Sequence, residues 1–255
     1  MLNHTTFGTG RRLFVGLHGW NGSLDTFEPL APHLPDDVRL LSVDLPGYGD
    51  SPALTQWSLD RVAHAVLETV EAAAPGQPFT LVGSCSGAVV GLYVGRHGGD
   101  TVQRFVMLEP FAYVPSYLRV LITPFFGRLF YWAAFANPFG RWITNLFLSG
   151  KRQDKTDMMA SFARGNPWVP HRYLGLFDDI PGAHDFDDLT MPKTMIVGEY
   201  TFEAVRESVS IWSQVWGECD VERLPETGHL ILDESPHLVA DLIFEDEAKP
   251  ARLTA

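Results

Sequence analysis

Cysteine is scarce in this chain, since its 255 residues include only Cys85 and Cys219. Two cysteines cannot build the disulfide framework of a small secreted domain, and the opening residues lack the apolar core of an export signal. We therefore expect a protein of the reducing cytoplasm. Long hydrophobic runs are lacking too. The longest uncharged stretch in the aromatic-rich middle segment, 129–140, has 12 residues and contains Pro138, whereas a membrane-spanning helix needs roughly 20. No transmembrane segment is expected.

Positive charge is in short supply, because 19 Lys and Arg stand against 31 Asp and Glu and leave a net charge of -12. A negatively charged surface repels a phosphate backbone, and the sequence contains no recognisable nucleic-acid-binding module. Nucleic acid is therefore not an expected partner. No group of His, Cys and Asp has the spacing of metal ligands, and we expect no metal and no organic cofactor.

Short apolar runs that end in turn residues alternate with longer amphipathic stretches, which predicts an α/β fold with a mostly parallel sheet flanked by helices. The composition, 45% hydrophobic and 20% charged, fits one globular domain or at most two. Strands are expected at 13–17, 38–43, 79–82, 105–108, 194–197 and 221–224. Helices are expected near 58–74, 86–97, 202–216 and 235–245.

The alternation stops between Pro110 and about Thr190, where aromatic residues crowd in and several Pro and Gly would break a long helix into short ones. The stretch from Phe111 to Phe147 holds 12 of the 31 aromatic residues of the chain. We therefore expect a core formed by 1–110 and 191–255, and an aromatic-rich helical lid formed by 111–190.

The strongest chemical motif is L-V-G-S-C-S-G-A at 81–88, which leaves an expected strand and enters an expected helix. Gly83 and Gly87 flank Cys85 at a distance of two residues. Such a turn forces its central residue into a strained conformation and needs small neighbours, so that strand and helix can approach and project the side chain. This pattern is a nucleophile elbow with cysteine at its tip.

Three other motifs accompany the elbow: H-G-W at 18–20 after the first expected strand, D-L-P-G-Y-G-D-S at 44–51, and Gly228-His229 before the last expected helix. Together with the elbow they resemble the α/β-hydrolase superfamily over nearly the whole chain. The resemblance implies Cys85 as nucleophile and His229 as base, with the backbone N–H groups of Trp20 and Ser86 as the oxyanion hole. We interpret the glycine-rich turn at 44–51 as structural.

The nucleophile departs from the serine that is usual in this superfamily. The positive end of the following helix and a nearby imidazolium both favour the thiolate form of a cysteine. Dienelactone hydrolases resemble this arrangement at the nucleophile, so a cysteine is compatible with an active enzyme. An engineered replacement of a natural serine is the alternative that the sequence leaves open.

The acid of the expected triad departs from the common pattern as well. Many members of the superfamily place an aspartate in a G-E-x-D segment, but here Thr201 stands at that position. Other members carry the acid at the end of the preceding core strand, where this chain has Glu109. We expect a Cys85-His229-Glu109 triad. The alternatives are that Glu199 or Glu203 orients the histidine, or that no acid does so.

The aromatic residues of the lid suggest an apolar substrate channel above Cys85. The expected lining residues are Phe125, Phe126, Tyr131, Trp132, Phe135 and Trp142. The alternative is that these rings pack only against the sheet domain or a second subunit. Between Phe111 and Leu176 eight Lys or Arg also stand against two Asp, either as a solvated face or as a site that attracts an acidic acyl carrier protein, coenzyme A or anionic lipid headgroups.

These residues favour an acyl-transfer enzyme that forms a thioester on Cys85 from an apolar acyl ester or thioester. Water as acceptor would make it a thioesterase or esterase, and another nucleophile would make it an acyltransferase or cyclase. The rival hypothesis is a non-catalytic relative that binds a small apolar ligand beneath its lid. The unusual nucleophile and Thr201 motivate that rival.

Overall fold

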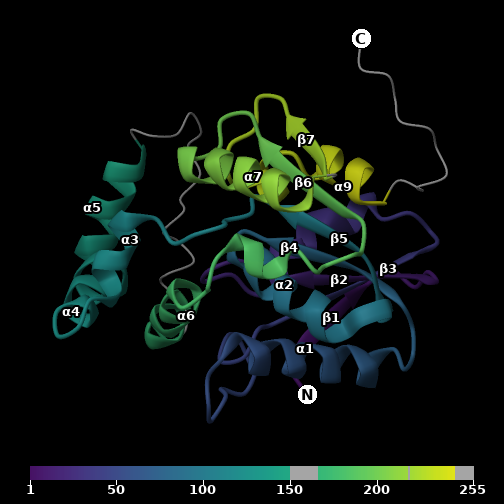
Figure 1. The fold of residues 1–255 in the computed structure, drawn as a ribbon, viewed down its shortest axis with the longest axis horizontal. Helices are drawn as coiled ribbons and strands as arrows, with labels where there is room; N and C mark the ends of the chain where they lie inside the picture. The colour runs from purple at the N-terminus through teal and green to yellow at the C-terminus, as the bar shows by residue number, and fades with distance from the viewer. Residues whose placement is uncertain (150–165, 218, 245–255) are drawn as a thin grey trace.

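A computed structural model describes residues 1–149, 166–217 and 219–244 of the chain. They form a seven-stranded sheet in the order β1-β3-β2-β4-β5-β6-β7, in which β1 is antiparallel to β3 and all other pairs are parallel (Figure 1). The strands are β1 (His4–Phe7), β2 (Arg12–Leu17), β3 (Val38–Val43), β4 (Phe79–Ser84), β5 (Val102–Leu108), β6 (Lys193–Gly198) and β7 (Asp220–Leu224). The expected α/β-hydrolase fold is confirmed.

Helices cover both faces of this sheet because side chains along each strand alternate between two buried layers. One layer joins Leu13, Val15 and Leu17 of β2 to helices α1 (Leu59–Ala73), α2 (Ser86–Gly98) and α7 (Glu203–Trp216). The other joins Phe14 to η1 (Leu24–His33), α8 (Ile231–Glu234) and α9 (Pro236–Phe244). Short 3-10 turn η2 (Gly99–Thr101) leads from α2 into β5.

Each expected strand and helix lies within a few residues of an observed one, but the core elements β1, η1, η2 and α8 were not predicted. β1 was not predicted, because its four residues, H-T-T-F, are short and partly exposed. It pairs with the edge of the sheet through a register that places His4 opposite Val43. Without β1, β3 would be the edge strand of the sheet, and β1 covers that edge.

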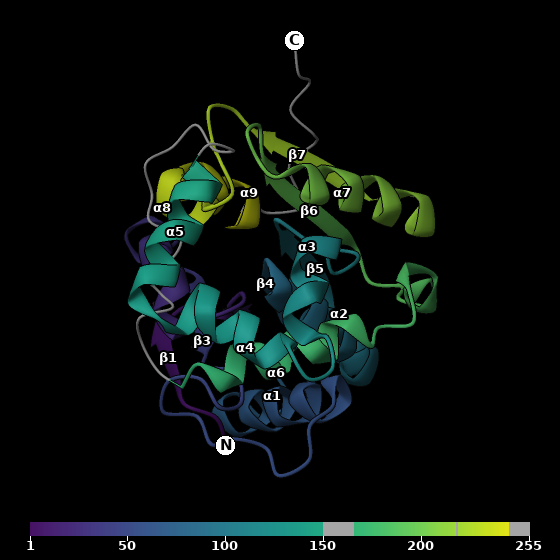
Figure 2. The same ribbon diagram turned by 90° about the vertical axis from the view of Figure 1, so that its left-hand side faces the viewer.

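All described residues between β5 and β6 are helical or irregular. The helices are α3 (Ser116–Arg119), η3 (Val120–Ile122), α4 (Gly127–Tyr131), the π-helical turn η4 (Trp132–Ala136), α5 (Pro138–Ser149), α6 (Trp168–Asp178) and η6 (Ala183–Phe186). Figure 2 shows α3, α4 and α5 in front of the sheet. No helix in the described ranges combines the length and apolar character needed to span a bilayer.

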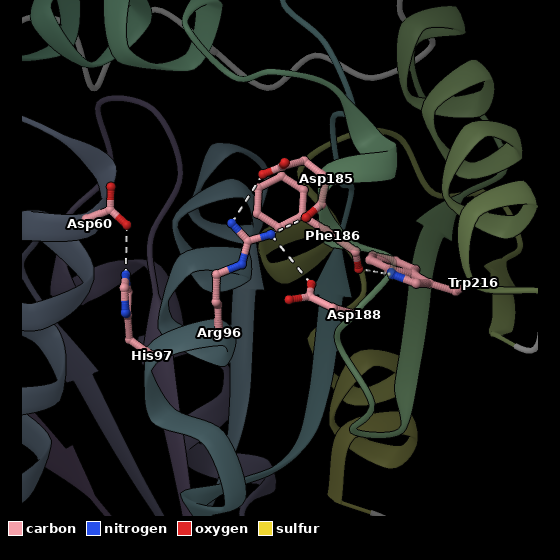
Figure 3. Close-up of polar contacts among 7 residues, drawn as sticks. All are labelled: Asp60, Arg96, His97, Asp185, Phe186, Asp188 and Trp216. Carbon is pink, nitrogen blue, oxygen red and sulfur yellow. Dashed lines mark hydrogen bonds and ion pairs between the residues drawn. The ribbon is translucent and has the colours of Figure 1, made fainter.

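The end of this helical segment is fastened to the core by Arg96 of α2 (Figure 3). Its guanidinium lies 3.2 Å from a carboxylate oxygen of Asp185 and 3.5 Å from one of Asp188. The same group lies 4.5 Å from the ring centroid of Phe186, whose carbonyl oxygen accepts a 2.8 Å hydrogen bond from the indole of Trp216. These contacts fix where the chain re-enters the sheet at β6.

Candidate active site

The parallel strands end at one edge of the sheet, and the motifs found in the sequence follow four of those ends. Trp20 comes after β2, Cys85 directly after β4, Glu109 directly after β5, and His229 after β7. Carboxyl ends of parallel strands are the usual place for ligand and reaction sites in such sheets. The topology therefore brings together residues that lie far apart in sequence.

The turn at Cys85 has the geometry that the elbow pattern predicts. Cys85 has φ +53° and ψ -118°, a backbone conformation that residues other than glycine adopt only under strain. A Cβ on Gly83 would lie 2.6 Å from Cα of Ala88, and one on Gly87 would lie 2.2 Å from the carbonyl oxygen of Leu17. Both flanking positions thus have room only for glycine.

His229 is enclosed beside the nucleophile and the acid. Its Nδ1 lies 2.7 Å from Oε2 of Glu109, and its ring also hydrogen-bonds the side chain of Cys85. Phe202 contacts the imidazole with a centroid distance of 4.8 Å, and Phe111 does so at 5.9 Å. The structure therefore brings Cys85, His229 and Glu109 into one hydrogen-bonded series.

Two opposing effects set the pKa of His229. Burial lowers it, but hydrogen bonds to Cys85 and Glu109, together with the negative charges of those two groups, outweigh burial and raise it to about 10. A carboxylate at Nδ1 also fixes the ring so that Nε2 is directed to the nucleophile. The site thus favours the imidazolium form next to the Cys85 sulfur.

Glu109 is almost fully buried, with 1% of its surface exposed, and has φ +55°. Its Oε1 accepts a 2.6 Å hydrogen bond from the backbone N–H of Gly198, and its Oε2 accepts one from the hydroxyl of Thr201. Three donors, counting His229, therefore satisfy a buried carboxylate. Sequence reasoning treated Thr201 only as the loss of an aspartate and missed this contact.

The alternative acid, Glu199, lies elsewhere. Its side chain is exposed and accepts a 2.9 Å hydrogen bond from the backbone N–H of Glu226. Glu203, at the start of α7, is exposed as well. The contact with His229 is made by Glu109.

The loop at 18–20 contacts the nucleophile through Gly19. A Cβ at Gly19 would lie 2.9 Å from Cβ of Cys85, so the loop packs directly on the elbow. Burial lowers the pKa of His18, whose neutral ring accepts a 3.0 Å hydrogen bond from the N–H of Leu45. His18 thereby ties this loop to the turn after β3. Ser86, the other expected donor, is the first residue of α2.

The loop that carries His229 is held by contacts that the sequence did not reveal. Glu234 accepts hydrogen bonds from the backbone N–H groups of Gly228 at 2.5 Å and Leu230 at 3.0 Å. A Cβ on Gly198 would lie 2.2 Å from the carbonyl oxygen of Gly228, so the end of β6 packs closely against the same loop. The acidic side chain five residues after the histidine was the available signal.

The six expected lining aromatics divide into two groups. Tyr131 and Phe135 are buried and lie near Trp20, with centroid distances of 6.3 and 5.3 Å. The other four are exposed: Phe125 by 97%, Phe126 by 62%, Trp132 by 49% and Trp142 by 61%. The structure thus encloses only part of the expected lining: Phe125 and Phe126 lie in the turn before α4, and Trp132 and Trp142 lie at exposed positions of η4 and α5.

The expected basic cluster falls partly outside the described residues, where Lys151, Arg152, Lys155 and Arg164 lie. Arg119 pairs with Asp178 at 2.7 Å. Arg128 lies 4.4 Å from the ring centroid of Trp168, and Arg172 lies 5.3 Å from that of Trp57. Among the described residues, no group of three His, Cys, Asp or Glu could hold a metal ion.

Comparison with known proteins adds a family match. The model of the alpha/beta hydrolase family matches residues 14–242. A thermophilic esterase from Thermogutta terrifontis superposes with a TM-score of 0.75 and 17% identity over 95% of this chain and 91% of its own. At this identity the likeness concerns the fold.

Two curated relatives are each described as a pimeloyl-[acyl-carrier protein] methyl ester esterase. The one from Methylococcus capsulatus is 37% identical over 103 residues, which are 40% of this chain and 38% of the relative. The one from Neisseria meningitidis serogroup C is 25% identical over 193 residues, 71% of this chain and 72% of the relative. The first match thus spans less than two thirds of the relative's length.

Proposed function

This chain belongs to the alpha/beta hydrolase family, and on that basis we propose that it is an esterase that cleaves an apolar acyl ester or thioester through a covalent thioester on Cys85. One observation carries the proposal: the hydrogen-bonded series from Cys85 through His229 to the buried Glu109. A nucleophile, a base and a group that orients the base are the parts that covalent acyl transfer requires.

In the first half-reaction, the Cys85 thiolate attacks the substrate carbonyl carbon and forms a tetrahedral intermediate. The backbone N–H groups of Trp20 and Ser86 stabilise its oxyanion. As the bond to the leaving group breaks, the imidazolium of His229 donates its proton to the departing alcohol or thiol. The acyl group remains on Cys85 as a thioester.

In the second half-reaction, neutral His229 removes a proton from water, and the resulting nucleophile attacks the thioester carbonyl. The intermediate collapses to the free acid and the Cys85 thiolate, which restores the ion pair with imidazolium. Water as acceptor agrees with the esterase description of the relatives. An amine or alcohol in its place would make the same site an acyltransferase, and a carbon nucleophile would make it a cyclase.

The substrate class follows from the helical segment 111–190, to which we assign the role of a lid. Buried Tyr131 and Phe135 beside Trp20 give an apolar wall for an acyl chain. The relatives are named for an acyl group carried on acyl carrier protein. The substrate we propose is therefore a small-molecule acyl ester or a thioester of a carrier protein or coenzyme A.

Tyr131 adds a polar feature to this wall. Its ring is fully buried, and its hydroxyl has no hydrogen-bond partner among the described residues. Leaving a buried hydroxyl unpaired costs about 1–3 kcal/mol. A substrate oxygen within the acyl chain would satisfy it, so we expect chains that carry an oxygen to be preferred over plain hydrocarbon chains.

The test is a panel of p-nitrophenyl esters and acyl thioesters with matched chains, followed by intact mass spectrometry. We expect a mass increase on Cys85 that decays with turnover, and its loss in Cys85→Ala. Cys219→Ala serves as the matched control and should behave as the wild type. Saturable ligand binding without an adduct or turnover would instead support the ligand-binding hypothesis and overturn the proposed activity.

A further inference from the structure

Trp20 has its backbone beside the nucleophile and its side chain among the helices of the lid. Its indole Nε1 donates a 2.7 Å hydrogen bond to the carbonyl oxygen of Pro170 in α6. The same indole lies 5.3 Å from the ring of Phe135 in η4 and 6.3 Å from that of Tyr131 in α4, measured between centroids. One side chain therefore joins residues 18–22, which we call the oxyanion loop, to three elements of the lid.

The oxyanion loop is fastened to the core as well as to the lid. At its start, Nε2 of His18 accepts a 3.0 Å hydrogen bond from the N–H of Leu45. At its end, the N–H of Gly22 donates a 2.9 Å hydrogen bond to the carbonyl oxygen of Gly19, which closes a turn that has Trp20 near its centre. The core thus fixes the two ends of the loop, and the lid contacts its middle.

The residue before Trp20 makes the contact with the lid important for the backbone. A Cβ at Gly19 would lie 2.9 Å from Cβ of Cys85 and 3.0 Å from the carbonyl oxygen of Ser84, so the close approach to the elbow requires glycine. Glycine restricts its own dihedral angles less than any other residue. The direction of the Trp20 N–H depends on ψ of Gly19 and on φ of Trp20. An anchored indole restrains the second of these angles.

The helix that supplies the acceptor, α6, is itself seated on the core through Tyr173. The hydroxyl of Tyr173 donates a 3.2 Å hydrogen bond to the carbonyl oxygen of Pro46, and the residue is 1% exposed. Its ring lies 5.1 Å from that of Tyr48 and 5.5 Å from that of Trp57. The seat of α6 on the core therefore determines where Pro170 holds the indole.

We propose that the indole of Trp20 is a positioning group through which α6 directs the Trp20 N–H at the oxyanion, so that the lid governs the chemical step in addition to substrate access. This inference rests on the proposed function, which assigns that N–H to the oxyanion. Such donors act only within a narrow range of distance and direction. Removal of one donor typically lowers kcat by about 10²–10³, and a donor that is present but misdirected loses part of that effect.

Two other roles of the indole lead to different expectations. If it only lined the wall for the acyl chain, its loss would raise KM for long chains and leave short ones unaffected. If it only stabilised the fold, its loss would lower the melting temperature and leave the rate of the folded enzyme unchanged. A positioning role predicts an equal loss of rate for short and long chains, because the same oxyanion forms with each.

The test is the rate at which p-nitrophenyl acetate and p-nitrophenyl octanoate acylate Cys85 before steady state. Trp20→Phe keeps a ring but removes the donor to Pro170, and should slow acylation by both esters by about tenfold. Alkylation of Cys85 by iodoacetamide forms no oxyanion, so its rate should stay as in the wild type. Trp168→Phe makes the same change at another tryptophan, in α6 itself, and serves as the matched control with wild-type rates.

A second variant tests whether the lid acts through the indole. Tyr173→Phe removes the hydrogen bond of α6 to Pro46 and should slow acylation by about threefold. In the double variant Trp20→Phe, Tyr173→Phe the loss should stay near tenfold instead of reaching about thirtyfold, because the second change acts only through the bond that the first removes. Melting temperatures verify that each variant is folded.

The possible outcomes separate this inference from the proposed function. Wild-type acylation rates in Trp20→Phe overturn the inference and leave the proposed function intact. The same holds for a loss confined to the octanoate, for equally slowed alkylation, and for independent losses in the double variant. If Trp20→Phe does not fold, Tyr173→Phe decides, and wild-type rates in it overturn the inference. A wild type that neither ester acylates overturns the proposed function, and the inference falls with it.

Discussion

The hydroxyl of Thr201 donates a hydrogen bond to Oε2 of Glu109, the same oxygen that lies 2.7 Å from Nδ1 of His229. Thr201 stands where the superfamily commonly has its aspartate. This residue therefore contacts the acid of the site, although it does not itself carry a carboxylate. A donor at this point holds the buried acid in the rotamer that faces the imidazole. We regard Thr201 as a positioning residue.

Replacing Thr201 tests this role. Thr201→Val keeps the shape but removes the donor, and the loss of one hydrogen bond to a charged group should lower kcat by about tenfold. Thr201→Ser restores a hydroxyl and should recover most of the rate with KM unchanged. Equal rates in the Val and Ser variants would show that the hydroxyl has no part in orienting Glu109.

The acid itself is tested by a matched pair of amide variants. Glu109→Gln should reduce turnover by at least about a hundredfold, because an amide in its place stabilises the imidazolium poorly and can favour the wrong histidine tautomer. Glu199→Gln should have little effect, since that side chain is exposed and bonded to the N–H of Glu226. Steady-state rates and melting curves of both variants are the measurement. A crippled Glu199 variant beside an active Glu109 variant would reverse the assignment.

The two cysteines should differ in reactivity. Burial raises the pKa of Cys219 to about 11, so its thiol stays protonated at neutral pH. Cys85, by contrast, is hydrogen-bonded to His229, whose raised pKa of about 10 keeps the imidazole protonated at neutral pH. Iodoacetamide at neutral pH should therefore label Cys85 first. Peptide mapping over time gives the two rates, and labelling of Cys219 should increase only as the pH approaches 11. Equal rates at neutral pH would contradict an activated thiolate at the elbow.

The alkaline limb of the pH profile reports on His229. In the free enzyme the imidazolium persists until the pH approaches about 10, and above that value the leaving group loses its proton donor, so kcat/KM should fall. Glu109→Gln removes a hydrogen bond and a negative charge that raise this pKa, and the limb should therefore move to lower pH. Glu199→Gln should leave the midpoint in place. A midpoint that is insensitive to Glu109 would mean that another group limits the rate.

The sequence predicted the sheet and its helices because apolar alternation records burial directly, as in the run 13–17 whose residues divide between two layers. It missed β1 because an exposed edge strand carries little of that signal. The elbow could be predicted because close backbone contacts leave room only for glycine at positions 83 and 87. The hydroxyl of Thr201 leaves no such pattern, since its contact with Glu109 joins residues that are 92 positions apart in the sequence.

The aromatic residues of 111–147 mark a second limit of prediction from the sequence. Their number indicates apolar contact, but composition cannot tell which side of a helix is covered. Tyr131 and Phe135 are buried, whereas Trp132, which lies between them, is half exposed. The helical phase of each residue, fixed only by packing on the core, decides the difference.

The place of the insertion has a consequence for how this protein can change. Residues 111–190 leave the sheet after β5 and return before β6, two strands that pair directly with each other. The groups proposed to react at Trp20, Cys85 and His229 lie outside that span, and Glu109 lies just before it. The segment is therefore exchangeable in principle: grafting a different one between these two strands would alter what reaches the sulfur, provided that it replaces the contact of Phe111 with His229 and those of Tyr131 and Phe135 with Trp20.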